Sequence, residues 1–369
     1  MLKKINTIRI IFFRSIAYRT LKALLLIKLM LDKNYSKKLS FNSNLKSILL
    51  LLHGGIGDAV VSSGFIKELS NYGIKVLVLA PKHLETFFND LMPYCTFIPY
   101  NTKKTYQTDL IINPYDPDPR DYHILKCLLR ISFTSGIFYN QHGIKLFDNI
   151  ANLESVHFNH RYQNLLQIMK EHFSNLSKLN LELNMAKRYS LNVSSEYSDE
   201  VASWVAHKID KPLIVINCAA SDPIRSFSPT LIIQLTEALL NSHKYSVAIF
   251  NCPEQTKQEI NKQNRTSGVF FSPFQTLPAI VALLFKAHFL ITPDTSFVHL
   301  AHFTATKSLS IYNNRLCFFR YDNNKMWGPD YPQGGQFFTS DKTYSDIGDD
   351  VRKLSFDEIA PTLHELQII

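Results

Sequence analysis

The sequence predicts an α/β protein made of two successive halves, each a parallel sheet with helices between its strands. Short apolar runs alternate with segments of helical periodicity in two series. A stretch rich in Asn, Ser, Lys and Glu, at about 174–212, separates the two series. Two α/β halves of similar size imply a ligand cleft between them, at the carboxyl ends of the strands.

The first half opens on Lys46–His53, an apolar run typical of a strand buried on both faces. A glycine turn and a helix over Ala59–Leu69 follow. Further strands are expected at Lys75–Ala80, Cys95–Tyr100, Asp109–Asn113 and Gly136–Tyr139, with helices at His83–Leu91 and Asp121–Leu129.

The second half repeats the alternation. Strands are expected at Leu213–Asn217, Ser246–Phe250, Gly268–Ser272, Phe289–Thr292 and Ser308–Tyr312, with helices at Thr230–Leu240, Leu277–Lys286 and Phe297–Phe303.

The net positive charge of the chain comes from its first fifty residues. The 369 residues contain 40 Lys plus Arg and 31 Asp plus Glu, which gives +9. Residues 1–50 hold 11 of these bases and one acid, Asp32, which gives +10. The other 319 residues therefore carry 29 bases and 30 acids, so the body of the protein is nearly neutral. This distribution argues against a nucleic-acid-binding domain.

The N-terminal segment is apolar as well as basic. Its longest apolar run, Ala23–Ile27, stops at Lys28, and each Lys or Arg costs about 2.5–3.5 kcal/mol at a bilayer centre, which disfavours a spanning helix. No clean apolar region leads to a small-residue cleavage site, so a secretory signal is not expected. Two interpretations remain, a segment on an anionic membrane surface or an extra helix packed on the first half. The five cysteines form no C-x-x-C pair and indicate buried thiols in a reducing compartment.

The first glycine turn does not fit a dinucleotide site. Gly55-Ile56-Gly57-Asp58 lacks the third glycine of G-x-G-x-x-G, and the second strand does not end in an acid that would bind a ribose. The Asp58 carboxylate would repel a pyrophosphate at this turn. Asp58 can instead cap the helix start or act as a general base in the cleft.

A second turn lies between the strand at Phe289–Thr292 and the next helix, and reads Asp294-Thr295-Ser296-Phe297-Val298-His299. The backbone amides of such a helix start can hold the phosphates of a leaving nucleotide. With this motif the sequence resembles glycosyltransferase family nine, the ADP-heptose:lipopolysaccharide heptosyltransferases of Gram-negative bacteria, whose late motif is Asp-Thr-Gly-x-x-His.

The resemblance extends over about residues 47–345, with motifs in the same order. The early Gly-Asp of the family matches Gly57-Asp58. The other matches are the basic-aromatic segment Arg225-Ser226-Phe227-Ser228-Pro229, the acid Glu254 after the second strand of the second half, and Trp327-Gly328-Pro329. The sequence departs from the family at Ser296, which replaces glycine, at Arg225 and Phe227, which replace lysine and tryptophan, and at Asn251-Cys252, which replaces a glycine pair.

The resemblance implies a GT-B fold, in which two Rossmann-like domains face each other across a cleft, with an N-terminal basic helical extension. The implied reaction is an inverting, metal-independent transfer of heptose from ADP-heptose to the inner core of lipopolysaccharide or lipooligosaccharide. Asp58 is the implied base, with Gly55 and Gly57 in the acceptor-side loop. The implied donor-binding residues are Arg225, Glu254, Asp294, Thr295, Ser296 and His299.

The residues alone leave simpler interpretations open. Asp294 and Thr295 can cap their helix, and His299 can be a core residue. Arg225 can be a solvated charge, and Glu254 an acid in the first turn of a helix. The literal D-x-D of Asp116-Pro117-Asp118 lies in a proline-rich loop and is interpreted as a turn. No metal and no cofactor are expected.

The expected domains are a membrane-surface segment at 1–44, an acceptor-binding domain at 45–185, a linker region at 186–210, a nucleotide-sugar-binding domain at 211–350 and a C-terminal helix at 351–369. The expected partners are a nucleotide-sugar donor, a lipid-anchored saccharide acceptor and an anionic membrane surface, without nucleic acid. The resemblance implies a cytoplasmic protein, peripheral on the inner face of the inner membrane. The alternatives are a transferase of the same fold that uses another nucleotide sugar, and a catalytically silent nucleotide- or lipid-binding relative.

Overall fold

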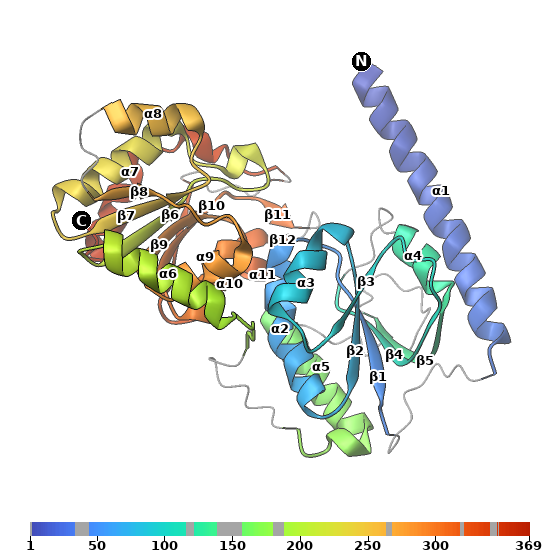
Figure 1. The fold of residues 1–369 in the computed structure, drawn as a ribbon. Helices are drawn as coiled ribbons and strands as arrows, with labels where there is room; N and C mark the ends of the chain where they lie inside the picture. The colour runs from blue at the N-terminus through green and yellow to red at the C-terminus, as the bar shows by residue number, and fades with distance from the viewer. Residues whose placement is uncertain are drawn as a thin grey trace. The chain divides into compact units, whose positions relative to one another are not determined.

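The computed structural model describes residues 2–33, 44–115, 122–138, 157–179, 188–262, 268–317, 321–339, 345 and 347–369. The chain divides into two compact units, unit 1 at Met1–Lys187 and unit 2 at Arg188–Ile369 (Figure 1). Each unit has its own parallel sheet, so the predicted α/β architecture with two halves is confirmed.

The sheet of unit 1 has five parallel strands in the order β3-β2-β1-β4-β5. The chain therefore reverses its direction of strand addition between β1 and β4, which is the topological switch point of a doubly wound sheet. The strands are β1 (Ser47–Leu51), β2 (Lys75–Ala80), β3 (Thr96–Pro99), β4 (Tyr106–Asn113) and β5 (Ile131–Phe138).

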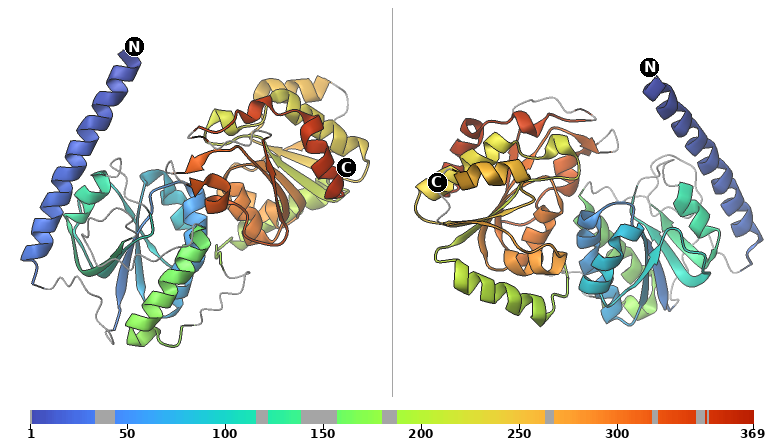
Figure 2. Two further views of the ribbon diagram at one scale, coloured as in Figure 1. Left: turned by 180° about the vertical axis from the view of Figure 1, so that it is seen from behind. Right: turned by 45° about the horizontal axis from the view of Figure 1, so that its top comes forward.

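Helices pack on this sheet because its strands are apolar on both faces. Leu49, Leu51, Leu77 and Leu79, on one face, are buried in a cluster with residues of α1 and α4. Helices α2 and α5 contact each other, and α3 follows β2 (Figure 2). The helices of unit 1 are α1 (Leu2–Leu31), α2 (Ile56–Asn71), α3 (Glu85–Leu91), α4 (Tyr122–Leu128) and α5 (Phe158–His172), with 3₁₀ turns η1 (Lys82–Leu84) and η3 (Ser174–Leu176).

The sheet of unit 2 has six parallel strands in the order β13-β10-β9-β6-β7-β8. Its switch point lies between β6 and β9, in the same relative position as that of unit 1. The strands are β6 (Leu213–Asn217), β7 (Ser246–Phe250), β8 (Val269–Phe271), β9 (Ala287–Pro293), β10 (Lys307–Tyr312) and β13 (Gly334–Phe338), and a separate hairpin pairs β11 (Leu316–Cys317) with β12 (Tyr321–Asp322).

One core cluster of unit 2 joins the sheet to α7 and α12. It includes Ile214 and Ile216 of β6, Leu235 of α7 and Ile359 and Leu363 of α12. The helices of unit 2 are α6 (Ser195–Lys208), α7 (Pro229–Asn241), α8 (Glu254–Lys262), α9 (Leu277–Leu284), α10 (Ser296–Thr304), α11 (Asn323–Trp327) and α12 (Phe356–Glu365), with 3₁₀ turns η5 (Pro223–Arg225) and η6 (Val351–Lys353).

The structure extends several expected elements and adds others. Strands β4 and β5 begin earlier than expected because they pair along their whole length, from Tyr106 with Ile131 to Asn113 with Phe138. Strand β13 was not expected, since its sequence contains two glycines. Residues 186–210, assigned to a linker from the sequence, include α6, which contacts α9.

The N-terminal helix α1 packs on unit 1. Leu25 and Leu29 are buried against α4 and the sheet, and Tyr18 and Leu21 lie beside them. Lys28 Nζ donates to the carbonyl oxygens of Leu128 at 3.2 Å, Leu129 at 3.0 Å and Ile131 at 2.6 Å. The ammonium group thus satisfies carbonyls at the C-terminus of α4. Within the part of the chain that the structure describes, no helix is both long and apolar enough to cross a membrane.

Candidate active site

Chemically active side chains follow the strands that flank each switch point. In unit 1, Asp58 lies just after β1 and Tyr115 just after β4. In unit 2, Asn217 ends β6 and Asp294 follows β9. Because ligands of doubly wound sheets bind outside the carboxyl ends of the strands at the switch point, these two places are the candidate sites.

Asp58 occupies the third position of α2 and uses both carboxylate oxygens. Oδ2 accepts a hydrogen bond from the Gly55 amide at 2.9 Å, and Oδ1 accepts one from the Tyr115 hydroxyl at 3.1 Å. The first bond is the backbone half of a capping box, so Asp58 does cap the start of α2. The second bond is long-range and aims the carboxyl toward the switch point.

Burial raises the pKa of the Asp58 carboxyl above its usual value. Four effects oppose this shift, namely the Gly55 amide, the Tyr115 hydroxyl, the nearby imidazole of His53 and the backbone amide of Asp58 itself. A carboxyl with a raised pKa is a stronger base than an ordinary aspartate.

Tyr115 connects Asp58 to the interior of unit 1, and the sequence analysis did not single it out. Its ring stacks on His53 at 4.4 Å between centroids and packs against Phe158 at 5.0 Å. The fully buried Arg161 donates to the Pro114 carbonyl at 3.0 Å and holds the backbone next to Tyr115. The Asn113-Pro114-Tyr115 segment, at the end of the strand beside β1, was the available signal.

The glycine that Asp58 requires is Gly54. A Cβ at this position would lie 1.9 Å from Asp58 Oδ2, so any side chain would displace the carboxylate. A Cβ on Gly55 would meet nothing within 4 Å. Gly55 is the N-cap of α2 and Gly57 is in its first turn, and neither has a positive φ. Glycine is therefore needed at position 54 because a side chain would overlap the Asp58 carboxylate, and not because of its backbone conformation.

In unit 2, the turn between β9 and α10 is built as a helix cap. Thr295 is the N-cap, and its hydroxyl accepts from the Phe297 amide at 3.2 Å. Ser296 is the first residue of α10 and has no positive φ, so the replacement of glycine by serine causes no backbone strain here. Asn217 donates to the Thr295 hydroxyl at 3.3 Å and ties the turn to the end of β6.

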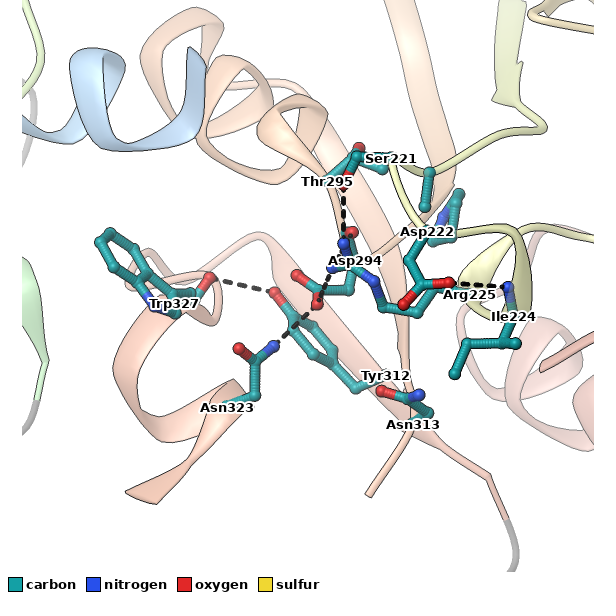
Figure 3. A network of polar contacts seen from close by, with 12 residues as sticks. Ser221, Asp222, Ile224, Arg225, Asp294, Thr295, Tyr312, Asn313, Asn323 and Trp327 are labelled. Atoms are coloured by element: carbon teal, nitrogen blue, oxygen red, sulfur yellow. Dashed lines mark hydrogen bonds and ion pairs between the residues drawn. The ribbon is translucent and has the colours of Figure 1, made fainter. Parts of the chain in front are cut away.

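Arg225 and Asp294 form an ion pair beside this turn. Arg225 Nη1 lies 2.7 Å from Asp294 Oδ2 and 3.1 Å from its backbone carbonyl, and Nη2 donates to Ser221 Oγ at 2.8 Å (Figure 3). The side chains of Arg225 and Asp294 are 13% and 9% exposed, so Arg225 is not a solvated charge. Arg225 Nε is also buried and has no hydrogen-bond partner among the described residues.

The position of Arg225 is determined by the short 3₁₀ turn η5, which ends at this residue. Asp222 caps η5 by accepting from the Ile224 amide at 3.3 Å, and Arg225 ends that turn. Ser228 then caps α7, with Pro229 at the first helical position. Phe227, between the two caps, is 4% exposed and belongs to the core, so its replacement of tryptophan changes packing.

Helix α11 and β10 complete the network around Asp294. Asn323, which the sequence analysis did not predict, donates to Asp294 Oδ2 at 2.7 Å. The Tyr312 hydroxyl donates to the Trp327 carbonyl at 3.1 Å, and burial together with the Asp294 carboxylate raises the pKa of Tyr312 (Figure 3). The Trp-Gly-Pro motif thus lies against the late motif.

His299 lies on the buried side of α10. Its ring is 4% exposed, contacts the Tyr189 hydroxyl at 3.3 Å through Nδ1 and packs edge-on against Trp327 at 6.2 Å. These contacts agree with the core interpretation of His299 and place it one turn behind Thr295.

Glu254 lies apart from this network, at the first position of α8. Its side chain is 72% exposed and pairs with Lys257 at 3.3 Å. Beside it, a cavity of about 140 Å³ opens at the ends of β7 and β8, lined in part by Cys252, Phe271 and Phe274. The sequence analysis did not predict this pocket, because its aromatic residues lie in an otherwise ordinary strand and loop.

Asn251 shapes the entrance to this pocket. Its φ is 52°, a left-handed conformation that asparagine tolerates better than most residues, and its side chain donates to Asn217 at 2.8 Å. Asparagine at position 251 is therefore compatible with the left-handed backbone that this turn adopts.

No group of three or more His, Cys, Asp or Glu side chains that could hold a metal ion is found among the residues that the structure describes. Asp116-Pro117-Asp118 lies outside the described residues.

Comparison with known families decides which class of protein has these features. The profile of glycosyltransferase family 9 (heptosyltransferase) matches residues 131–316, which is half of the chain and includes Arg225, Asp294 and Thr295. The chain belongs to glycosyltransferase family 9. It is therefore a glycosyltransferase.

Relatives of this glycosyltransferase cover nearly the whole chain. An Escherichia coli (strain K12) protein, named provisionally as lipopolysaccharide heptosyltransferase 4, is 21% identical over 319 residues, which cover 81% of this chain and 83% of the relative. The family 9 glycosyltransferase of Veillonella parvula DSM 2008 superimposes with a TM-score of 0.65 at 13% identity, covering 89% of this chain and 98% of that one. The ADP-heptose lipopolysaccharide heptosyltransferase II of E. coli has a TM-score of 0.58 at 14% identity, covering 87% and 98%. These likenesses confirm the expected GT-B fold.

Proposed function

We propose that this family 9 glycosyltransferase transfers heptose from ADP-heptose to the inner core of lipopolysaccharide or lipooligosaccharide, with inversion and without a metal ion. The observation that carries the proposal is the Arg225–Asp294–Asn323 network at the start of α10, the switch point of unit 2. Structures of the E. coli heptosyltransferase WaaC are described with ADP and with ADP-2-deoxy-2-fluoro heptose, which supports the choice of donor.

In this proposal the diphosphate of the donor binds at the start of α10. The amide of Ser296, the first residue of the helix, is a donor there, and the helix dipole favours an anion. Arg225 adds a guanidinium group that Asp294 pairs with through Nη1, and its Nε proton is still unsatisfied. A buried unsatisfied donor costs about 1–3 kcal/mol, a cost that a phosphate oxygen would relieve. Asp294 and Asn323 hold Arg225 in position.

The nucleoside of the donor would lie toward the ends of β7 and β8. The lining of the cavity beside Cys252 is largely polar and includes the ring of Phe271, on which a base could stack. The exposed carboxylate of Glu254 is a suitable acceptor for ribose hydroxyls. His299 would act indirectly, by supporting the turn from its buried position on α10.

Asp58 is the proposed general base in unit 1. Inverting transfer requires removal of a proton from the acceptor hydroxyl as it attacks the anomeric carbon. The raised pKa of Asp58 suits this role, and Tyr115 orients its carboxyl. An added Cβ on Gly55 would meet nothing within 4 Å, so there is open space beside the loop for a saccharide to approach.

Metal independence is proposed because protein groups can stabilise the leaving diphosphate. Arg225 and the α10 amides provide the positive potential that a divalent ion supplies in other transferases. Turnover in the presence of excess EDTA should equal turnover without it. A rate that falls with EDTA and returns with Mg²⁺ or Mn²⁺ would contradict this part of the proposal.

The deciding experiment is a donor screen on a heptose-deficient lipooligosaccharide acceptor. ADP-heptose should support transfer, measured as ADP release and as an acceptor mass increase, whereas UDP-sugars should not. Turnover with another nucleotide sugar and none with ADP-heptose would favour the alternative transferase of the same fold. Absence of turnover with every donor, despite ADP binding, would favour a catalytically silent relative.

The acceptor is lipid-anchored in this proposal, so the protein is expected to work as a peripheral protein at the inner face of the inner membrane. The basic excess of residues 1–50 supports this location, since anionic lipid attracts each nearby Lys or Arg by about 1 kcal/mol.

A further inference from the structure

Helix α1 has two different long faces. The face that includes Leu25, Lys28 and Leu29 is committed to unit 1 through the buried cluster and the hydrogen bonds to the end of α4. These contacts fix the rotation of α1 about its axis. They therefore determine which side chains point away from the protein.

The outward face of α1 is apolar. Five large hydrophobic side chains on it are 46–77% exposed, and a soluble helix would normally bury such residues or replace them by polar ones. Consecutive members are eight, three, three and one residues apart, which places them on one face of the helix at 100° per residue. The five are Ile16, Leu24, Ile27, Met30 and Leu31.

This concentration is specific to α1. The described residues contain nine exposed large hydrophobic side chains, and the other four, Phe285, Phe338, Ile347 and Leu366, are distributed over different elements of unit 2. An apolar strip on one helix therefore calls for a specific explanation.

The charge of α1 identifies the occupant of this strip. The helix contains no Asp or Glu. Arg19 is exposed at the edge of the apolar strip, from where its guanidinium can reach phosphate groups. Packing of α1 against α1 of a second copy would bring equal positive charge against it, so that arrangement is disfavoured. The seven basic residues of α1 are Lys3, Lys4, Arg9, Arg14, Arg19, Lys22 and Lys28.

We propose that the outward face of α1 is a lipid-docking surface that inserts Leu24, Ile27 and Leu31 into the interface of an anionic bilayer while the opposite face holds α1 on α4. This inference deepens the proposed function, on which it rests for the presence of a lipid-anchored acceptor. Helix α1 then lies along the membrane surface as an in-plane amphipathic helix. Because Lys28 and Leu29 fasten it to α4, it docks unit 1 in a defined orientation.

The test is flotation of the full-length protein with vesicles of phosphatidylcholine alone or with phosphatidylglycerol in equal parts. Wild type should float with the anionic vesicles, and less so as salt is added. The triple variant Leu24→Ser/Ile27→Ser/Leu31→Ser should bind them at least about tenfold more weakly, because three inserted apolar side chains are lost. The matched control, Phe285→Ser/Phe338→Ser/Ile347→Ser, removes exposed apolar groups from unit 2 and should bind as wild type does.

A gain-of-signal measurement complements the loss. The fluorescence of an Ile27→Trp variant should shift to the blue when anionic vesicles are added, whereas a Phe285→Trp variant should show no such shift. Vesicle binding by the triple variant equal to that of wild type, or absence of the Ile27→Trp shift, would overturn the proposal. So would a triple variant that converts a dimer to a monomer without losing vesicle binding, since the face would then be a protein interface.

Failure of this inference and failure of the proposed function give different results. The triple variant should retain wild-type turnover on a delipidated core oligosaccharide, which does not need the membrane. Vesicle binding by a protein that turns over no donor would leave the docking surface intact and reject the enzymatic proposal.

Discussion

Asp58 is at once a cap of α2 and the proposed base. Asp58→Asn keeps an oxygen that can accept from the Gly55 amide but removes the base, so kcat should fall by about 10²- to 10⁴-fold with the donor KM little changed. Initial-rate kinetics would measure this. Asp90→Asn, at an exposed acid of α3, serves as the control and should retain full activity. An Asp58→Asn enzyme with wild-type kcat would exclude Asp58 as the base.

Tyr115 controls the pH at which Asp58 works. The base acts when deprotonated, so activity rises with pH through the Asp58 pKa, which burial has already raised. Tyr115→Phe removes a hydrogen bond to the charged form, so the pKa should rise further and the acidic limb of the kcat profile should move to higher pH. A pH–rate profile measures the shift. An acidic limb that stays in place or moves to lower pH would contradict this role for Tyr115.

The effects of substituting Arg225 and Asp294 should depend on each other for the free energy of unfolding but not for donor binding. Arg225→Ala leaves a nearly buried carboxylate without its partner, so the free energy of unfolding should fall by about 3–5 kcal/mol. Arg225→Ala/Asp294→Ala removes both charges and should recover most of that loss while remaining weak in donor binding. Urea unfolding and ADP titration separate the two effects, and equal recovery of both would argue against a direct role of Arg225 in donor binding.

Much of the candidate site could be predicted from the sequence because its motifs are formed by residues that are neighbours in the chain. The Asp294-Thr295-Ser296 turn is a strand, a cap and a helix start, and the structure contains all three in order. Tyr115 and Asn323 could not be predicted, because their contacts with Asp58 and Asp294 join residues 57 and 29 positions apart. The only local signal for Tyr115 is its place at the end of the strand beside β1, and Asn323 has no local signal.

At the scale of elements, the apolar runs that precede turns were predicted best. Strands β2, β6 and β7 begin and end as expected, since every residue of β6 and β7 is buried. The edges of the sheets were predicted less well. Strand β13, with the sequence GGQFF, exists because it pairs with β10, an interaction that local propensity does not show.

The junction between α1 and α4 gives a prediction at this scale. Lys28→Met keeps the aliphatic stem but removes two hydrogen bonds at the end of α4 and one to the first residue of β5, so unit 1 should lose about 1–2 kcal/mol of unfolding free energy. Chemical denaturation would measure this, with Lys33→Met, an exposed lysine just past α1, as the control. Equal stability of the two variants would mean that apolar packing alone holds α1.

At the scale of the whole molecule, the two units repeat one strand order around two switch points. Each unit has its own core, and the donor-binding residues proposed here all belong to unit 2. A fragment of residues 188–369 should therefore fold and bind ADP with nearly the affinity of the full chain, yet transfer no sugar, because it lacks Asp58. Calorimetric titration would test this. Loss of ADP binding by a folded fragment would show that unit 1 contributes to the donor site.

The place of Asp58 on α2 has a consequence for the timing of the reaction. A carboxyl that has taken a proton from the acceptor is a weaker hydrogen-bond acceptor than the carboxylate it was. Proton transfer would therefore weaken the bond from the Gly55 amide and loosen the first turn of α2 just when the glycosylated product has formed. Loosening of the helix start would then favour product release. In the product complex, the Gly55 amide should exchange its hydrogen faster than in the free enzyme.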